Sequence, residues 1–525
     1  MATTSGAPAA GAPPSHDAPA AGQSAQHDTA FFGHPRGLAT LFFTEMWERF
    51  AYYGNRAILI LFMTASAAIG GLGWDVAKAG AVYGTYVALV YMLSLPGGWM
   101  ADKILGLRRA VLYGGIFIMG GQICLAIPGS TLFFPGLACI IIGTGLLKPN
   151  VSAIVGELYT QEDRRRDAGF SIFYMGINLG AFISPLVVGY LAQGSTFQGF
   201  LQNAGLDPRN SWHWGFGIGS LGMLFGLIQY MQGWKYLGQA GIHPSITPAS
   251  PQGAQARRAF WTGAIAIVAV IATIALLVQK NVISVQTVTN GFSWLYLVIV
   301  VGFFVWLFQF GQWTREERKR LIVILVLFCA AAVFWSAFEQ AASTLNLFAQ
   351  RNTDNQLLGI TYPPSWLQSV NALMIIIFAP VFAWLWLRLG RRDPSSPTKF
   401  AVGLLFVGLG FAVMIGAAAA SASGQLVSPM WLVLTYFLHT VGELCLSPVG
   451  LSSMTRLAPD RVKGMMMGVW FLAASVGNLI AGRVAGFYTS FSLTQLFGAV
   501  TAFALVASLI MFLLIRPIKR MLARE

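Results

Sequence analysis

The sequence is poor in charged residues, and this shortage excludes a soluble globular protein. Asp, Glu, Lys and Arg supply 10% of its 525 residues, whereas 56% of the residues are hydrophobic. Soluble domains carry about 25% charged residues. The composition therefore predicts an integral membrane protein, and its long apolar runs predict an all-α one.

Cysteine and histidine are scarce as well. The four cysteines lie in apolar stretches at unrelated spacings, which is typical of small hydrophobic fillers and not of a metal site. A Gly-rich phosphate loop is also missing. Of the six histidines, only His439 lies near the middle of an apolar span, so a membrane-bound enzyme such as an acyltransferase lacks its usual base at the midplane. We therefore expect no enzymatic activity, no metal and no cofactor.

Apolar runs of about 20 residues, the length that crosses a bilayer, follow one another along the chain. We predict fourteen spans, near 38–65, 79–101, 108–128, 131–158, 166–193, 211–236, 257–279, 292–312, 319–350, 364–390, 398–420, 427–455, 462–490 and 492–517.

The net charge of +14 is distributed as a topology signal and not as a nucleic-acid surface. With the N-terminus inside, 25 of the 33 Lys and Arg residues fall in cytoplasmic segments. The outer loops hold only Lys78, Arg209, Lys280 and Arg351. This asymmetry follows the positive-inside rule. It predicts a multi-pass membrane protein, embedded in lipid, with both termini cytoplasmic and no nucleic-acid partner.

Two similar sets of six spans flank an insertion whose two spans contain no buried charge. The predicted organisation is a disordered cytoplasmic tail (1–33), an N-terminal six-helix bundle (34–236), a linker with two extra transmembrane helices (237–318), and a C-terminal six-helix bundle with a short cytoplasmic tail (319–525).

Charged side chains nevertheless lie inside the first predicted span. At 100° per residue, one stripe of the helix contains Glu45, Glu48, Arg49, Tyr52, Tyr53 and Arg56. A charge at bilayer depth costs roughly 2.5–3.5 kcal/mol on insertion scales. The stripe therefore needs a polar interior, and it indicates a pathway for protons, ions or charged solutes.

Further buried charges lie at matching heights in other spans, at about 1.5 Å per residue. Height alone pairs Arg56 with Glu339, and Lys148 with either Glu443 or the two glutamates of the stripe. Burial favours the neutral carboxyl group and a nearby cation favours the charged one, so such a pair can act as a gate that binds a proton conditionally. Polar and aromatic side chains at the same levels are Tyr91, Asn178, Trp335, Asn371 and Trp470.

Two loops resemble those of a known superfamily. The segment Gly98-Trp-Met-Ala-Asp102-Lys103-Ile-Leu-Gly106-Leu-Arg108-Arg109 is similar to the Gly-x-x-x-Asp-Arg/Lys…Gly-x-Arg-Arg loop of the major facilitator superfamily. A weaker echo, Leu389-Gly390-Arg391-Arg392, lacks the aspartate. The resemblance implies the fold of that superfamily, in which two six-helix bundles alternate between conformations.

Two longer motifs resemble signatures of the proton-dependent oligopeptide transporters. Glu45-x-x-Glu48-Arg49-Phe50-x-Tyr52-Tyr53-Gly54 is similar to the signature Glu-x-x-Glu-Arg-Phe-x-Tyr-Tyr-Gly of that family. Phe173-Tyr174-Met-Gly-Ile-Asn178-Leu-Gly180 is similar to its second signature, Phe-Tyr-x-x-Ile-Asn-x-Gly. The resemblance covers residues 34–517, and bacterial members similarly carry two extra helices between the halves.

This resemblance implies a symporter that imports di- and tripeptides by alternating access, with protons as the coupling ion. The implied proton-coupling residues are Glu45, Glu48, Arg49, Lys148 and Glu339. The implied peptide-binding residues are Arg56, Tyr52, Tyr53, Tyr91, Lys148, Asn178, Trp335, Asn371, Glu443, Ser447 and Trp470. The implied gate residues are Arg56, Glu339, Lys148 and Glu443.

Two positions depart from family patterns. Mammalian members have a histidine in the second span where Gly84 stands here, so proton binding would rest on carboxylates. Some bacterial members carry two adjacent acids where this chain has Phe338 before Glu339, which leaves the number of protons open.

Two alternatives also stay open from the sequence. A family member could move nitrate, another small anion or a drug-like solute in place of peptides. A non-transporting sensor would bind peptide without accumulating it, although the sequence shows no long soluble domain for signalling.

Overall fold

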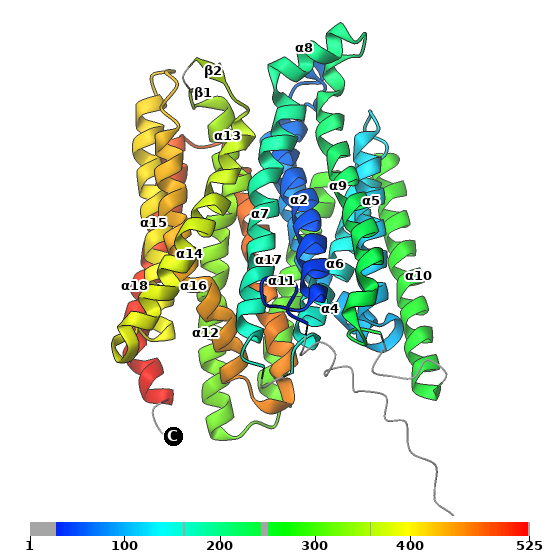
Figure 1. Ribbon diagram of the computed structural model, residues 1–525. Coiled ribbons are helices and arrows are strands. Elements are labelled where there is room, and N and C mark those ends of the chain that lie inside the picture. The colour runs from blue at the N-terminus through cyan, green and yellow to red at the C-terminus, as the bar shows by residue number, and fades with distance from the viewer. Residues whose placement is uncertain (1–27, 161–162, 243–249, 358, 523–525) are drawn as a thin grey trace, which may run out of the picture.

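Long helices run side by side through the computed structural model, with short elements at their two ends (Figure 1). The structure describes residues 28–160, 163–242, 250–357 and 359–522. Within these residues, twelve helices are long and apolar enough to cross a membrane. Most of the predicted tail (1–33) and part of the predicted linker (237–256) lie outside the described residues.

The N-terminal half, as the term is used below, comprises the elements from α2 to α9. Its helices are α2 (Arg36–Thr64), α3 (Val76–Met92), α4 (Ser94–Met100), α5 (Leu107–Ala126), α6 (Phe133–Glu157), α7 (Arg166–Gln193), α8 (Ser195–Asn203) and α9 (Ser211–Gly233). Short helical turns join them at η1 (Ala67–Ile69), η2 (Ala101–Leu105), η3 (Pro208–Asn210) and η4 (Trp234–Leu237).

The C-terminal half comprises the elements from α12 to α18, and an inserted pair of helices precedes it. The inserted helices are α10 (Pro251–Gln279) and α11 (Val285–Phe310). The helices of the C-terminal half are α12 (Arg315–Phe338), α13 (Thr344–Arg351), α14 (Ser369–Leu389), α15 (Ser396–Ser421), α16 (Met430–Leu457), α17 (Lys463–Ala485) and α18 (Leu493–Leu522). Its short turns are η5 (Glu339–Ala342), η6 (Pro364–Gln368), η7 (Gly390–Arg392) and η8 (Asp460–Val462).

A small β-hairpin marks one end of the molecule. Strands β1 (Gln356–Leu357) and β2 (Ile360–Thr361) pair antiparallel, with Gln356 opposite Thr361. The hairpin lies at the same end as α8, at the top of Figure 1, and α18 ends at the opposite side. We call these the β-hairpin end and the terminal end.

The predicted spans and the helices agree to within a few residues at most ends. The span predicted at 166–193 coincides with α7. The second span is longer than its prediction of 79–101, because α3 continues through α4 and η2 to Leu105. Two predicted spans are not among the twelve apolar helices. They are α2, which is 29 residues long and carries the charged stripe, and α9, which is 23 residues long.

The two halves meet along helices that approach very closely. Helix α3 packs along α17, and α7 packs along α14. A Cβ atom built on Gly482 of α17 would lie 2.5 Å from the carbonyl oxygen of Gly80, and one on Gly84 would lie 2.9 Å from the Cα atom of Gly482. Small residues let helix backbones touch in a membrane, where packing drives association. Any larger residue here would push the halves apart.

The inserted helices lie at the periphery, as their apolar composition predicts. The apolar stretch of α10 buries no described residue, and the helix lies at the edge of Figure 1. Helix α11 is attached through Arg483 of α17, whose guanidinium donates to the Thr289 carbonyl and the Ser293 hydroxyl, both at 2.5 Å, and to Asn290 Oδ1 at 2.7 Å. One charged side chain therefore connects the insertion to the C-terminal half.

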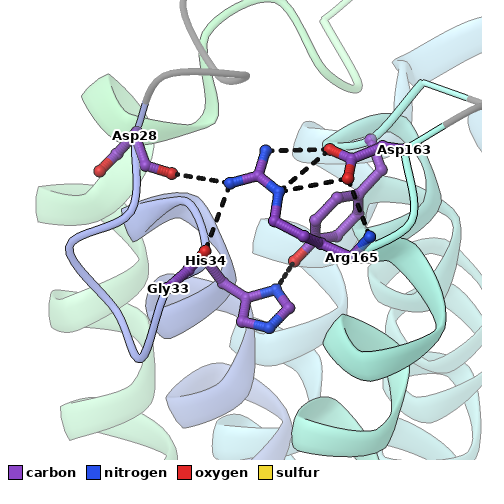
Figure 2. A network of polar contacts seen from close by, with 6 residues as sticks. Asp28, Gly33, His34, Asp163 and Arg165 are labelled. Atoms are coloured by element: carbon purple, nitrogen blue, oxygen red, sulfur yellow. Dashed lines mark hydrogen bonds and ion pairs between the residues drawn. The ribbon is translucent and has the colours of Figure 1, made fainter.

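A polar cluster holds the start of the chain against the loop between α6 and α7 (Figure 2). Arg165 forms an ion pair with Asp163 at 2.9 Å and donates to the carbonyl oxygens of Asp28 and Gly33, each at 3.3 Å. His34 is buried, and its Nδ1 atom lies 2.9 Å from the Tyr159 hydroxyl. Residues 28–34 are thus tied to the terminal end, whereas the sequence predicts that the tail is disordered up to residue 33.

Protonation of His34 should weaken this cluster. Burial and the Arg165 guanidinium hold the pKa of the His34 imidazole below its ordinary value, although Asp163 acts in the opposite direction. A histidine with a lowered pKa in the folded state stabilises the fold above its unfolded pKa of about 6.5, and this contribution is lost as the pH falls below that value.

We therefore expect the melting temperature of the detergent-solubilised wild type to fall more between pH 7.5 and 5.5 than that of His34→Gln. Glutamine can still hydrogen-bond to Tyr159 but does not titrate. All other groups titrate in both proteins, so the difference between the two pH profiles isolates His34. Parallel profiles would contradict this role.

Candidate functional site

The charged stripe of α2 is organised around one arginine. The Arg49 Nε atom lies 3.0 Å from Glu45 Oε1, and the same guanidinium makes a short contact with Glu48 Oε2. All three side chains are at most 3% exposed. Two carboxylates share one cation, so the cluster holds one negative charge more than positive when both are ionised.

Half of the acceptor capacity of this cluster is unused. Among the described residues, Glu45 Oε2 and Glu48 Oε1 are buried and have no hydrogen-bond partner. A buried oxygen without a partner is costly, and a proton on it relieves both the excess charge and part of that cost. The ring of Tyr52 lies 5.1 Å from the Arg49 guanidinium and shields it on one side. The geometry therefore suits reversible protonation of a carboxylate.

A second ion pair joins the two halves. The Arg56 guanidinium lies 2.6 Å from Glu339 Oε2, and both side chains are at most 8% exposed. Glu339 reaches Arg56 because α12 ends at Phe338 and the chain continues as the 3₁₀ turn η5, which begins at Glu339. The Tyr53 ring lies 5.7 Å from the Arg56 guanidinium. The structure thus brings together the pair that helix heights predict.

Lys148 lacks the carboxylate partner that height predicts. In this conformation, no carboxylate of the described residues forms an ion pair with its ammonium group. Its Nζ atom lies 3.9 Å from the centre of the Tyr91 ring and 5.7 Å from that of Phe471 on α17. The pairing with Glu443 or with the stripe is therefore not formed, because Arg49 takes both stripe glutamates and an amide holds Glu443.

That amide belongs to Asn371 of α14. Its Nδ2 atom donates to Glu443 Oε2 at 3.2 Å and to the Thr440 hydroxyl at 2.9 Å. Glu443 on α16 is half-buried and has a second oxygen for another partner. Asn178 on α7 donates to the carbonyl of its own helix neighbour Tyr174 at 3.0 Å. Its amide oxygen keeps its acceptor capacity.

Aromatic side chains of the C-terminal half form a wall beside these groups. Trp335 and Trp470 meet edge to face with ring centres 6.5 Å apart. A Cβ atom on Gly450 would lie 2.2 Å from the Trp470 ring, so glycine is required for this packing. The buried Trp335 Nε1 and Ser447 Oγ atoms have no hydrogen-bond partner among the described residues.

Sequence reasoning missed two buried amides, one at the contact between the halves and one within the N-terminal half. Asn346 of α13 donates to the Ala57 carbonyl of α2 at 2.7 Å, and it is fully buried. Asn55 donates to the Tyr86 hydroxyl at 3.1 Å within the N-terminal half. The sequence does contain one indication of the buried role of Asn346, because its neighbours Leu345 and Leu347 are both apolar.

The arrangement as a whole offers fixed charges of both signs in a buried setting. Arg56 and Lys148 come from the N-terminal half, whereas Glu339 and Glu443 come from the C-terminal half. Such a set can bind a molecule that carries both charges, and it can exchange a proton with a carboxylate. A rearrangement of the halves would change the distances from the cations of one half to the carboxylates of the other.

Comparison with known proteins decides the family. A model of the POT family matches residues 108–503, which is well over half of the chain. The chain belongs to the POT family. The match includes the motif around Asn178, and the Glu45–Gly54 motif lies before it.

Other proteins support POT membership over nearly the full length. The chain is 43% identical over 510 residues to the peptide transporter YePEPT of Yersinia enterocolitica, covering 94% of this chain and 96% of that protein. It is 36% identical over 503 residues to a di-/tripeptide transporter of Lactococcus lactis subsp. cremoris, covering 94% and 97%. This POT chain is therefore a multi-span membrane transporter and not an enzyme.

Solved structures agree with this assignment. A crystal structure of a peptide transporter POT in complex with sulfate superposes with a TM-score of 0.86 at 45% identity. The superposition covers 94% of this chain and 96% of that chain. The helices of the POT chain thus follow the arrangement of a POT transporter almost throughout.

Proposed function

We propose that this POT chain is a proton-coupled symporter that imports di- and tripeptides across the bacterial inner membrane. The observation that carries the proposal is the buried set of cations and carboxylates contributed by opposite halves, next to carboxylate oxygens that have no partner. A zwitterionic peptide presents one charge of each sign about one peptide length apart. A site whose two signs lie on separate halves can bind it only while the halves are close.

The proposed architecture has fourteen transmembrane helices. We assign α2 and α9 to the membrane as well, because both are long and pack against α7 in the interior of the N-terminal half. This gives six-helix bundles within residues 34–236 and 319–525, with α10 and α11 as an inserted hairpin. Both termini face the cytoplasm in this proposal, so the β-hairpin end is the outer end.

Proton coupling is assigned to the α2 stripe and to Glu339. An incoming proton would neutralise one of the unpartnered oxygens of Glu45 or Glu48 and weaken their hold on Arg49. Lys148 would then compete with Arg49 for the carboxylate that stays ionised. An inward proton gradient drives this step, since one charge gains about 2.3 kcal/mol per 100 mV of membrane potential.

Peptide binding is assigned to groups of both halves. Arg56 and Lys148 attract the C-terminal carboxylate of the peptide, and Glu443, supported by Asn371, attracts its amino group together with the Asn178 amide oxygen. The side-chain pockets are assigned to Tyr52, Tyr53, Tyr91, Trp335, Ser447 and Trp470. Aromatic walls with few fixed polar atoms suit varied peptide side chains.

The gate is assigned to ion pairs that cross between the halves. In this proposal the Arg56–Glu339 pair holds the outer end closed, and protonation of Glu339 would remove its attraction. Lys148 and Glu443 are assigned to a pair that forms in another conformation. Alternating access then follows from rocking of one bundle against the other around the central charges.

Uptake of a labelled dipeptide into proteoliposomes tests the function directly. We expect accumulation with an inward proton gradient, collapse of accumulation with a protonophore, and competition by tripeptides but not by single amino acids. Protein that is folded and monodisperse but takes up no peptide would contradict the proposal. A small anion such as nitrate, or a drug-like solute, would then be tested as the transported species.

Glu45→Gln separates coupling from binding. The variant keeps the size of the side chain but cannot cycle a proton, so gradient-driven accumulation should fall by more than tenfold. Counterflow of peptide needs no net proton movement and should persist. Asp207→Asn, which removes an exposed acid near the β-hairpin end, serves as the control and should change neither measurement. Equal loss of both activities in Glu45→Gln would contradict a coupling role.

Glu443→Gln tests recognition of the peptide amino group. Loss of the charge should weaken binding of free-amine dipeptides about tenfold, whereas N-acylated dipeptides, which carry no cation there, should bind nearly as before. Competition assays with matched pairs of peptides measure this ratio. A uniform loss for both classes would argue against contact between Glu443 and the amine.

A further inference from the structure

Among the residues that the structure describes, four hydrogen bonds without any charged partner join the two halves. In each of them a side chain of the C-terminal half donates to a main-chain carbonyl of the N-terminal half. The pairs are Asn346 to Ala57 at 2.7 Å, Trp366 to Leu186 at 2.9 Å, Ser369 to Phe182 at 2.7 Å and Ser475 to Ala88 at 2.7 Å. The acceptors lie on α2, α7 and α3.

Asn346 lies at the most consequential of these contacts. Its side chain is 0% exposed, and its acceptor Ala57 directly follows Arg56 in α2. Its own helix, α13, directly follows η5, which begins with Glu339. The neutral hydrogen bond and the Arg56–Glu339 ion pair therefore connect the same two segments of the chain.

The two contacts respond differently to a proton. Neither an amide nor a backbone carbonyl titrates in the physiological range, so the Asn346 bond is unchanged when Glu339 is neutralised. The ion pair, in contrast, loses its Coulomb attraction at that step. One contact between α2 and η5–α13 thus depends on protonation and the other does not.

We propose that Asn346 is a positioning residue of the outer gate. Its hydrogen bond to Ala57 favours the closed conformation of the β-hairpin end whether or not Glu339 is protonated. The gate itself rests on the proposed function, but the geometry of the Asn346–Ala57 hydrogen bond does not. When the halves separate, the Ala57 carbonyl keeps its position in α2, where a helical N–H group can satisfy it. Opening therefore costs free energy mainly at the Asn346 amide, which loses its acceptor and has to form a hydrogen bond with water instead.

The expected size of the effect is moderate. A polar hydrogen bond between membrane helices contributes about 0.6 kcal/mol on average and up to about 1.7 kcal/mol. Removal of the donor should therefore raise the ratio of open to closed outer ends about threefold, and at most about eighteenfold. Such a shift is large enough to measure as a population, and too small to unfold the protein.

Asn346→Leu and Asn355→Leu form a matched pair of variants. Leucine has the same branched arrangement of four side-chain heavy atoms as asparagine, and it removes the donor. Asn355 donates to the Ala349 carbonyl at 2.8 Å, near the same end of the molecule, but both partners belong to the C-terminal half. The two variants therefore lose the same kind of bond, and only one of these bonds crosses between the halves.

Distances across the outer end provide the readout. Nitroxide labels are placed at Phe200 on α8 and Ile360 on β2, which are 61% and 69% exposed and belong to different halves. The full-length protein, with its four native cysteines replaced, is studied in lipid nanodiscs without peptide by pulsed electron double resonance. Measurements at pH 6 and pH 8 give the ratio of long to short distances in each variant.

We expect Asn346→Leu to raise this ratio about threefold to eighteenfold, with the same factor at both pH values, while Asn355→Leu matches the wild type. An unchanged ratio in Asn346→Leu, an equal shift in Asn355→Leu, or a factor that depends on pH would each overturn the proposal. If Asn346→Leu is not monodisperse, Asn346→Ala removes the same donor without branching and is measured in its place. Because no substrate is present, failure of peptide uptake would not affect this result.

Discussion

An apolar helix bundle supplies no water to its charged side chains, so each charge on α2 needs a partner made of protein. Arg49 finds two carboxylates on its own helix, and Arg56 finds one on the opposite half. The rest of the site follows from this division. A charge satisfied within one helix can change its proton content without moving the halves, whereas a charge satisfied across the interface ties its protonation to their separation. Coupling between protons and conformation needs both kinds.

The close approach of α3 and α17 sets the geometry in which these partners meet. Glycines at 80, 84 and 482 allow backbone contact, and this contact fixes how near the cations of one half come to the carboxylates of the other. The same packing places Lys148 against Phe471 of α17. An ammonium group over aromatic rings is only partly compensated, so this cation is ready to accept a carboxylate when one arrives. In the proposed function, that carboxylate is the C-terminus of the peptide.

Much of the fold could be predicted from the sequence, because helix length and hydrophobic composition both respond directly to the thickness of a bilayer. Span 166–193 coincides with α7, and the Arg56–Glu339 pair follows from helix heights. The partners of Lys148 could not be predicted, since height does not reveal that Arg49 takes both nearby glutamates. The hydrogen bond of Asn346 could not be predicted for a related reason. Its acceptor is a backbone carbonyl, which every residue has, so no pattern of side chains indicates the partner.

Because the acceptors are main-chain carbonyls, these hydrogen bonds constrain the sequences of the two halves differently. All four neutral donors belong to the C-terminal half, and all four acceptors are main-chain atoms of the N-terminal half. Substitutions among Ala57, Phe182, Leu186 and Ala88 leave an oxygen in place whatever residue they introduce. Single substitutions in the C-terminal half can therefore change the proposed equilibrium between the closed and open conformations of the outer end. Substitutions in the N-terminal half can therefore change its contacts with the transported solute without changing that conformational equilibrium.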